Sequence, residues 1–222
     1  MELMKSYRLR DKEGEKMKKF ELTAEYVTNI FGKKLFRIKA LVEFGNVKEG
    51  DLGGFVEKES NIDDDGNAWV SGNAQVFGNA KISGNAQVYG NAKVFGNAWV
   101  FGNAWISGNA QVYGNACVAG NVQISENAQV YGNACVAKNL DYAIVGGFGS
   151  EQQTITFFCQ KDGSVGAKCG FFYGTLEEFR EKVLETHGES KYAQEYLMIA
   201  DLIELHFAGG CDGNDKDNHS CL

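Results

Sequence analysis

The 222-residue chain contains no proline and only three histidines, which occur at positions 187, 206 and 219. Since general-base catalysis and zinc binding commonly use histidine, we expect neither kind of site in the first 186 residues. No apolar run is long enough to span a membrane, and Met1 to Phe20 lacks the apolar centre of a signal peptide. We therefore expect a cytoplasmic protein without a membrane partner.

Charge is scarce over much of the chain and unevenly spread over the rest. Between Gly66 and Ala137 only Lys81, Lys93 and Glu126 are charged, although the whole chain has a net charge of −7. Basic residues gather before position 40. Lys33, Lys34, Arg37 and Lys39 are candidates for contact with nucleic acid or with an acidic protein, but a solvated face that helps solubility is the preferred interpretation.

The six cysteines show no spacing typical of a zinc site, and we interpret them as free thiols. Cys117 and Cys135 are eighteen residues apart and are expected to be neighbours in a reduced state. Cys159 is predicted to face Val165 in a hairpin, which excludes a bridge to Cys169.

The dominant feature of the sequence is a six-residue motif, Gly-Asn-Ala-x-Val-x, which repeats from Gly66 to Lys138. Val or Ile stands at every sixth position from Val70 to Val136, and Ala precedes nearly all of them by two positions. A fixed short period indicates a solenoid, in which each unit buries its apolar side against its neighbours. Three six-residue units close one coil, so residues eighteen apart should stack, with Val and Ile inside and Gly and Asn at the turns.

This repeat resembles the hexapeptide-repeat, left-handed parallel β-helix proteins, a family that includes acyltransferases. More narrowly, KALVEFGNVKEGDLGGFV at 39–56 and GTLEEF at 174–179 resemble a group of phage and prophage hexapeptide-repeat proteins. The resemblance implies a mainly β fold with a left-handed solenoid, and it makes an accessory phage protein plausible.

Modules of different composition flank the repeat. We predict an N-terminal charged arm and β-hairpin module at 1–50, a solenoid with its entry cap at 51–142, a ββαα module at 143–210 and an acidic disordered tail at 211–222. In the entry cap, Val56 and Ile62 are expected to continue the Ala track. Thr175 and Glu178 predict a capping box at the start of the first helix.

The residues beside each inward Val or Ile point outward and define the surface of the solenoid. One wall carries an aromatic file, by which we mean Phe77, Phe95, Tyr113 and Tyr131, each eighteen residues after the last. Such a file can be covered by the end modules or stack as a ladder, pair with a second copy, or bind a foreign partner. Further anchors for a partner are Trp99 with Phe101 and Trp69 with Trp105.

The repeat itself carries no catalytic chemistry. It has no histidine, and Glu126 is its only acid, so an acyltransferase lacks its usual general base there. We expect no enzyme, no catalytic residue, no metal, no cofactor and no small-molecule substrate. The preferred hypothesis is a non-enzymatic interaction protein, most simply a homodimer. A second possible partner is a host protein or a protein–nucleic acid complex. An example is a CRISPR effector that a phage protein inhibits. An acyltransferase and a structural spacer are the alternatives.

Overall fold

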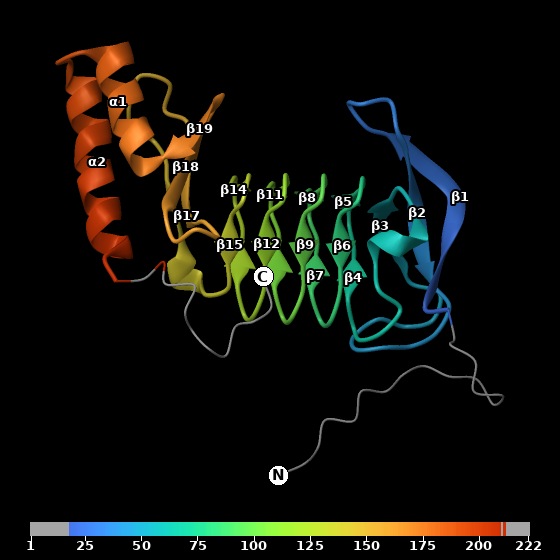
Figure 1. Cartoon of the computed structure of the whole chain (residues 1–222). Helices are drawn as coiled ribbons and strands as arrows, with labels where there is room; N and C mark the ends of the chain where they lie inside the picture. Colours follow the sequence, from blue (N-terminus) through green and yellow to red (C-terminus); the bar gives the residue numbers. More distant parts are fainter. Residues whose placement is uncertain (1–17, 210, 212–222) are drawn as a thin grey trace, which may run out of the picture.

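The computed structural model describes residues 18–209 and 211, and shows a parallel β-solenoid of about five turns with a module at each end (Figure 1). The solenoid begins with β3 (Leu52–Val56) and continues with strands of two residues each. They are β4 (Trp69–Val70), β5 (Gln75–Val76), β6 (Lys81–Ile82), β7 (Gln87–Val88), β8 (Lys93–Val94), β9 (Trp99–Val100), β10 (Trp105–Ile106), β11 (Gln111–Val112), β12 (Cys117–Val118), β13 (Gln123–Ile124), β14 (Gln129–Val130) and β15 (Cys135–Val136). The mainly β fold class predicted from the repeat is confirmed.

Stacking follows the predicted eighteen-residue interval. Val88 lies beside Ile106 in a parallel pair, and Ile106 lies beside Ile124. The Val and Ile side chains of all twelve short strands are completely buried, as are the Ala side chains that precede them. At about 25 cal/mol per Å² of buried apolar surface, this continuous column is the main stabilising element of the solenoid.

The corners explain why Gly and Asn recur. Gly84 has a φ of +65°, and a Cβ there would lie 3.1 Å from both N and O of Gly102 in the next coil. The Asn side chains form three ladders, in which each Nδ2 donates to the Oδ1 of the Asn eighteen residues later, for example over 2.9 Å from Asn85 to Asn103. One corner departs from the rule, since Glu126 adopts a φ of +56° in place of Gly.

The entry cap differs from its predicted register. Val56 pairs with Val76 and Ile62 is bridged to Ile82, so both continue the Val track and not the Ala track. The separation here is twenty residues because Ile62 and Val70 are eight residues apart, two more than in the later units, whereas Val56 and Ile62, on either side of the short 3-10 helix η1 (Glu59–Asn61), keep the usual six.

An N-terminal hairpin extends one wall of the solenoid. Strand β1 (Phe20–Thr28) pairs with β2 (Lys34–Ala40), and β2 pairs antiparallel with β3, giving the order β1-β2-β3-β5-β8-β11-β14. The turn between β1 and β2 contains Gly32, with φ of +74°. The register of the β1–β2 pair shifts between Leu22 and Tyr26.

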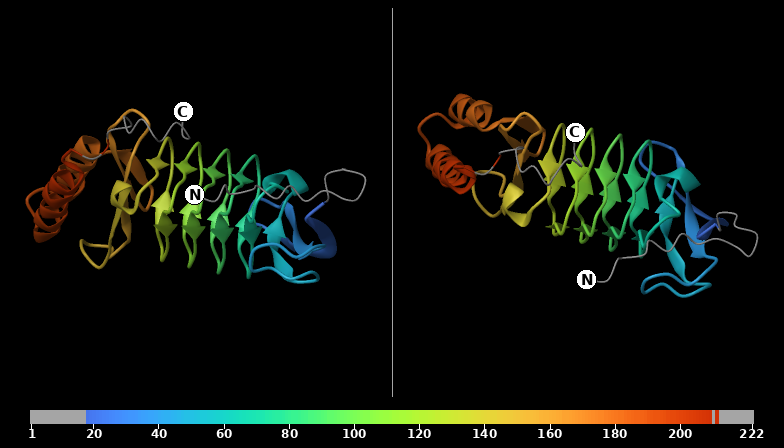
Figure 2. Two further views of the ribbon diagram at one scale, coloured as in Figure 1. Left: turned by 90° about the horizontal axis from the view of Figure 1, so that it is seen from below. Right: turned by 60° about the horizontal axis from the view of Figure 1, so that its bottom comes forward.

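The C-terminal module contains more strands than predicted. After the 3-10 helix η2 (Asn139–Asp141) come β16 (Tyr142–Val145), β17 (Ile155–Cys159), β18 (Val165–Cys169) and β19 (Phe172–Thr175), which form an antiparallel sheet in that order. Helices α1 (Leu176–His187) and α2 (Lys191–Phe207) follow (Figure 2). The predicted capping box at Thr175 and Glu178 is present.

The cysteines correct another prediction. Cys159 does lie opposite Val165, but it is joined by a disulfide to Cys211, with 5.3 Å between the two Cα atoms. Cys117 is also disulfide-bonded, although not to its stacked neighbour Cys135, which is free like Cys169. The interpretation of all six as free thiols is therefore wrong. The chain that follows α2 brings Cys211 next to Cys159, 52 residues earlier, and no local spacing predicts that contact. The cytoplasmic location stays a prediction.

Side chains close both ends of the solenoid. At the N-terminal end Lys19 and Asn61 donate to backbone carbonyls, and both residues are completely buried. At the C-terminal end Asn139, Asp141 and Thr156 accept from backbone N–H groups. Phe158, on the opposite face of β17 from Phe157, is fully buried as a member of the solenoid core.

Candidate interaction surface

The aromatic file is a stacked ladder. Phe77 and Phe95 stack with ring centroids 4.9 Å apart and planes 5° apart. Phe95 and Tyr113 follow at 4.7 Å, and Tyr113 and Tyr131 at 4.4 Å. The predicted alignment is therefore confirmed, and the eighteen-residue coil is its cause.

Both end modules reach this ladder. Phe31, in the turn between β1 and β2, lies 6.1 Å from Phe77 and 6.4 Å from Phe95. Tyr173 of β19 packs edge-on against Tyr131 at 4.7 Å and donates its hydroxyl hydrogen to Gln160 Oε1. These two rings extend the file to six, which we call the aromatic row (Phe31, Phe77, Phe95, Tyr113, Tyr131 and Tyr173).

Burial along the row is uneven. Phe77 is only 6% exposed because Leu35 and Phe55 also pack around it, so its prediction as a free partner contact is wrong. Phe95, Tyr113 and Tyr131 are half-buried. Burial, with a smaller effect from Tyr131, raises the pKa of Tyr113 to about 12. The accessible part of the row thus begins at Phe95.

The hairpins at the two ends of the row carry exposed apolar residues that the sequence reasoning missed. Ile30 is 87% exposed and Phe31 61%, while Phe171, between β18 and β19, is fully exposed. Both hairpins rise on the side of the solenoid occupied by β5, β8, β11 and β14 (Figure 1). A large apolar side chain beside the turn residues Gly32 and Gly170 was the signal available in the sequence.

The tryptophans divide into two kinds. Trp69 is buried, because Phe20 and Phe44 pack edge-on against it, which corrects its prediction as a surface anchor. Trp99 and Trp105 are about half exposed on the other two walls. Trp99 lies 4.6 Å from Phe101, which is itself half-buried, and donates its indole hydrogen to Ser83 Oγ. These two walls are secondary candidate surfaces.

Two of the four residues of the predicted basic patch are paired with acids within the chain. Lys33 Nζ lies 2.7 Å from Glu57 Oε1, and Arg37 Nε lies 2.8 Å from Glu25 Oε2. Lys34 lies over the ring of Tyr26. Burial raises the pKa of Glu57, but hydrogen bonds from Lys33 and from the Gly78 N–H outweigh that effect and hold it below its usual value. Lys39 is half-buried in β2. Contacts between nucleic acid and Lys33 or Arg37 would have to compete with these two ion pairs.

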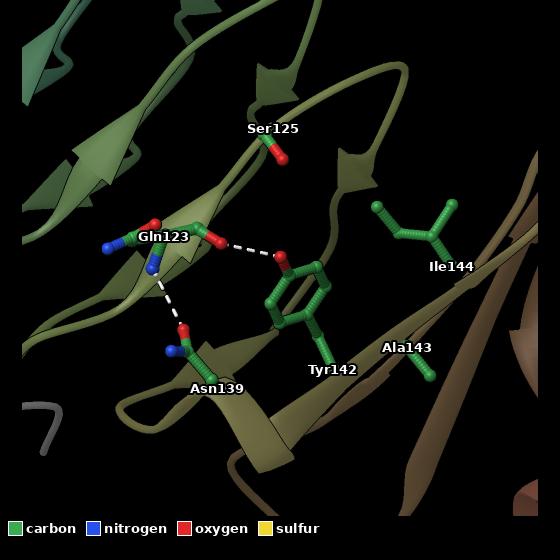
Figure 3. A pocket seen from close by; sticks show the side chains of 6 residues that line it. All are labelled: Gln123, Ser125, Asn139, Tyr142, Ala143 and Ile144. Carbon is green, nitrogen blue, oxygen red and sulfur yellow. Dashed lines mark hydrogen bonds between the residues drawn. The ribbon is translucent and has the colours of Figure 1, made fainter.

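An open cavity of about 360 Å³ lies at the C-terminal end of the solenoid, between β13 and β16 (Figure 3). Its lining is Gln123, Ser125, Asn139, Tyr142, Ala143 and Ile144. The Tyr142 hydroxyl donates to Gln123 O, and Asn139 Oδ1 accepts from Gln123 N at 2.9 Å. These bonds cover the free edge of β13, so the polar groups of the lining serve the end of the solenoid.

The two described histidines, both in the C-terminal helices, form no site. His187 stands in the last turn of α1 with its ring 5.5 Å from that of Tyr196, and His206 lies beside Phe207 in α2. His219 and the expected acidic tail, beyond Cys211, are outside the described residues. Within residues 18–209 and 211, no three His, Cys, Asp or Glu side chains are grouped to hold a metal ion. No described helix is both long and apolar enough to cross a membrane.

Comparison with known proteins concerns the solenoid alone. A search of curated proteins gives no match. Three stretches, residues 74–90, 86–102 and 110–126, match the family model described as the YdcK beta solenoid repeat. They include the strands from β5 to β9 and from β11 to β13, so the central coils of this chain are similar to the YdcK repeat.

Proposed function

We propose that the chain is a non-enzymatic interaction protein that binds a partner protein along the aromatic row. The observation that carries this proposal is a continuous line of rings that joins three parts of the molecule and ends in two exposed hairpin turns. Contiguous exposed apolar patches on soluble proteins are typical of interaction sites. Aromatic side chains are also enriched among the residues that dominate binding energy.

The projecting hairpins favour a foreign partner over the predicted two-fold pairing of two rows. Phe31 and Phe171 stand at opposite ends of the row, and two copies placed row to row would meet first at these turns. The four stacked rings span roughly 14 Å, which is three coil spacings of about 4.8 Å. An α-helix with its side chains is about 10–12 Å wide and suits this span.

The acyltransferase alternative receives no support from the arrangement of side chains. The described histidines are in the helices, and the rings of the row carry no acid or base apart from the phenols of Tyr113, Tyr131 and Tyr173. Burial raises the pKa of Tyr113 and Tyr173, which makes either a poor general base near neutral pH. The resemblance to phage proteins extends the proposal to an inhibitor of a host-defence effector, for which a CRISPR nuclease is the first candidate.

Photocrosslinking tests the proposed surface. A photoreactive phenylalanine placed at Phe31 or at Phe171 should give crosslinks to one and the same partner in expressing cells. The same group at Trp105 is the matched control, because that ring is exposed on another wall and should not give this product. A partner that crosslinks equally at all three positions, or only at Trp105, would overturn the proposal. Turnover of a coenzyme A thioester by the purified chain would instead support the acyltransferase.

A further inference from the structure

A second surface lies on the wall formed by β4, β7, β10 and β13, away from the aromatic row. The outward side chains of this wall, from Trp69 to Ser125, are all Trp, Tyr, Gln or Ser, and none of them is charged. Trp105 is 47% exposed, and Tyr89 packs edge-on against it with ring centroids 6.3 Å apart. The wall therefore presents an aromatic platform among neutral polar groups.

The open cavity of about 360 Å³ continues this wall at its C-terminal end (Figure 3). Trp105 lies directly beside Gln123 in the pairing of β10 with β13, and Gln123 lines the cavity. The two side chains project from the same face, because they stand at equivalent positions of stacked coils. The indole and the cavity thus lie on either side of one glutamine.

The end of the solenoid uses only part of the lining of this cavity. The bonds described above occupy the backbone of Gln123, the Oδ1 of Asn139 and the hydroxyl of Tyr142. The Gln123 amide group, the Ser125 hydroxyl and the Asn139 Nδ2 have no hydrogen-bond partner among the described residues. The same holds for the Ser125 N–H at the free edge of β13. These donors and acceptors are open to solvent or to a ligand.

The charged residues close in sequence leave the cavity neutral. Glu126 and Lys138, of opposite charge, are exposed at corners of the coil, and the Asp141 carboxylate accepts the N–H groups of Ala137 and Lys138. Burial raises the pKa of Tyr142, so that its phenol stays neutral near neutral pH. A charged ligand would therefore gain no ion pair from the lining.

A sugar matches this combination of groups. Its hydroxyls donate and accept hydrogen bonds, as the side chains of Gln, Asn and Ser do. The C–H groups on one face of a sugar ring pack against an aromatic ring. A protein partner fits less well, because Ala143 and Ile144 are the only aliphatic side chains of the lining and do not form the apolar core of a protein interface.

We propose that Trp105 and the cavity beside Gln123 form a binding site for a neutral oligosaccharide, with one sugar ring on the indole and another in the cavity. The site lies on a different wall from the aromatic row, so this inference does not depend on the function proposed above. The open shape of the site predicts weak binding, which several copies of the sugar on one surface would strengthen.

A glycan array that carries both neutral and acidic oligosaccharides tests the class of ligand. The labelled chain should bind neutral glycans and should bind sialylated or uronate-containing glycans less. Absence of binding to every glycan on the array would overturn the proposal, as would stronger binding to the acidic glycans.

A matched pair of tryptophan variants locates the site. With the neutral glycan that binds best, Trp105→Ala should weaken binding by about tenfold or more in calorimetric titration, with an unchanged circular dichroism spectrum. Trp99→Ala should bind as the parent does, because Trp99 is 45% exposed on another wall. Equal losses from both variants, or no loss from Trp105→Ala, would show that the sugar does not bind here.

A pair of glutamine variants tests the part played by the cavity. Gln123→Ala removes the free amide group between the indole and the cavity and should weaken binding. Gln87→Ala, on the other side of Trp105, should not, because Gln87 Nε2 already donates to Asn67 O at 2.8 Å. If Gln87→Ala weakens binding as much as Gln123→Ala does, the cavity is not part of the site and the proposal fails.

Discussion

The two ends of the solenoid are closed by opposite kinds of hydrogen-bonding group. At the N-terminal end the buried ammonium of Lys19 donates to Asp63 O at 2.7 Å and to Ala68 O at 3.0 Å. At the C-terminal end Thr156 Oγ1 accepts from Gln129 N at 2.9 Å. The difference follows from the direction of the chain.

Between coils, the N–H of one residue donates to the carbonyl seventeen residues later, as from Trp69 N to Ala86 O. The first coil therefore presents carbonyls such as Ala68 O that lack a preceding coil. The last coil presents N–H groups such as that of Gln129. An unpaired buried polar group costs about 1–3 kcal/mol. The N-terminal end therefore needs side chains that donate to its carbonyls, and the C-terminal end needs side chains that accept from its N–H groups. The ends of this solenoid are thus not interchangeable.

The largest effect is expected at the C-terminal end, where an apolar ring supplements the polar cap. Phe158→Ala removes a completely buried side chain from the end of the core and should lower the free energy of unfolding by about 3–5 kcal/mol. Denaturant titration followed by circular dichroism measures this loss. Phe171→Ala is the control, because that ring is fully exposed and its loss should change stability little. Comparable losses from both variants would show that β17 does not close the core.

A smaller effect is expected at the N-terminal end. Lys19→Met keeps a long side chain but removes the donor to Asp63 O and Ala68 O, and should cost about 1–3 kcal/mol. Lys18→Met is the matched control, since Lys18 pairs with half-exposed Glu59 at the surface. Thermal unfolding of both variants decides the point. A Lys19 variant as stable as the Lys18 variant would mean that an apolar plug serves this end as well as a donor does.

The smallest effect concerns the aromatic row, whose side chains are Phe toward the N-terminal end and Tyr toward the C-terminal end. The pKa of Tyr113 is raised to about 12 in the folded chain, so the unfolded chain releases this proton at lower pH. The contribution of Tyr113 to stability is therefore intact below about pH 10 and declines as the pH rises toward 12.

Absorbance titration at alkaline pH should show a late phenolate step that Tyr113→Phe removes and Tyr89→Phe retains. If the late step persists in the Tyr113 variant, another phenol is responsible and the burial of the row is less than the structure shows.

Sequence reasoning predicted the parts of the fold that repeat, and it was least successful where a single segment covers another. The pairing of Val88 with Ile106 follows from the period alone, because every coil repeats the same environment. The burial of Trp69 does not, since it depends on Phe20 and Phe44, whose positions in space no local pattern specifies.

The same reason applies to the other differences. Strand β19 was missed because Gly170 and Gly174 interrupt its pattern, and the disulfide because Cys159 and Cys211 are 52 residues apart in sequence. Of the candidate surface, the four stacked rings were predictable from the period. The hairpin turns that carry Phe31 and Phe171 extend it from outside the repeat and were not.

The regular coils between the two caps set the distance between the two ends of the molecule. Each eighteen-residue coil adds about 4.8 Å along the axis and repeats the same corners, so whole coils can be added or removed without altering either cap. The distance between Phe31 and Tyr173 can therefore change only in steps of that size. A partner that contacts both hairpins would therefore fit only one number of coils. Adding one coil would move the two hairpins apart, so that such a partner could no longer contact both.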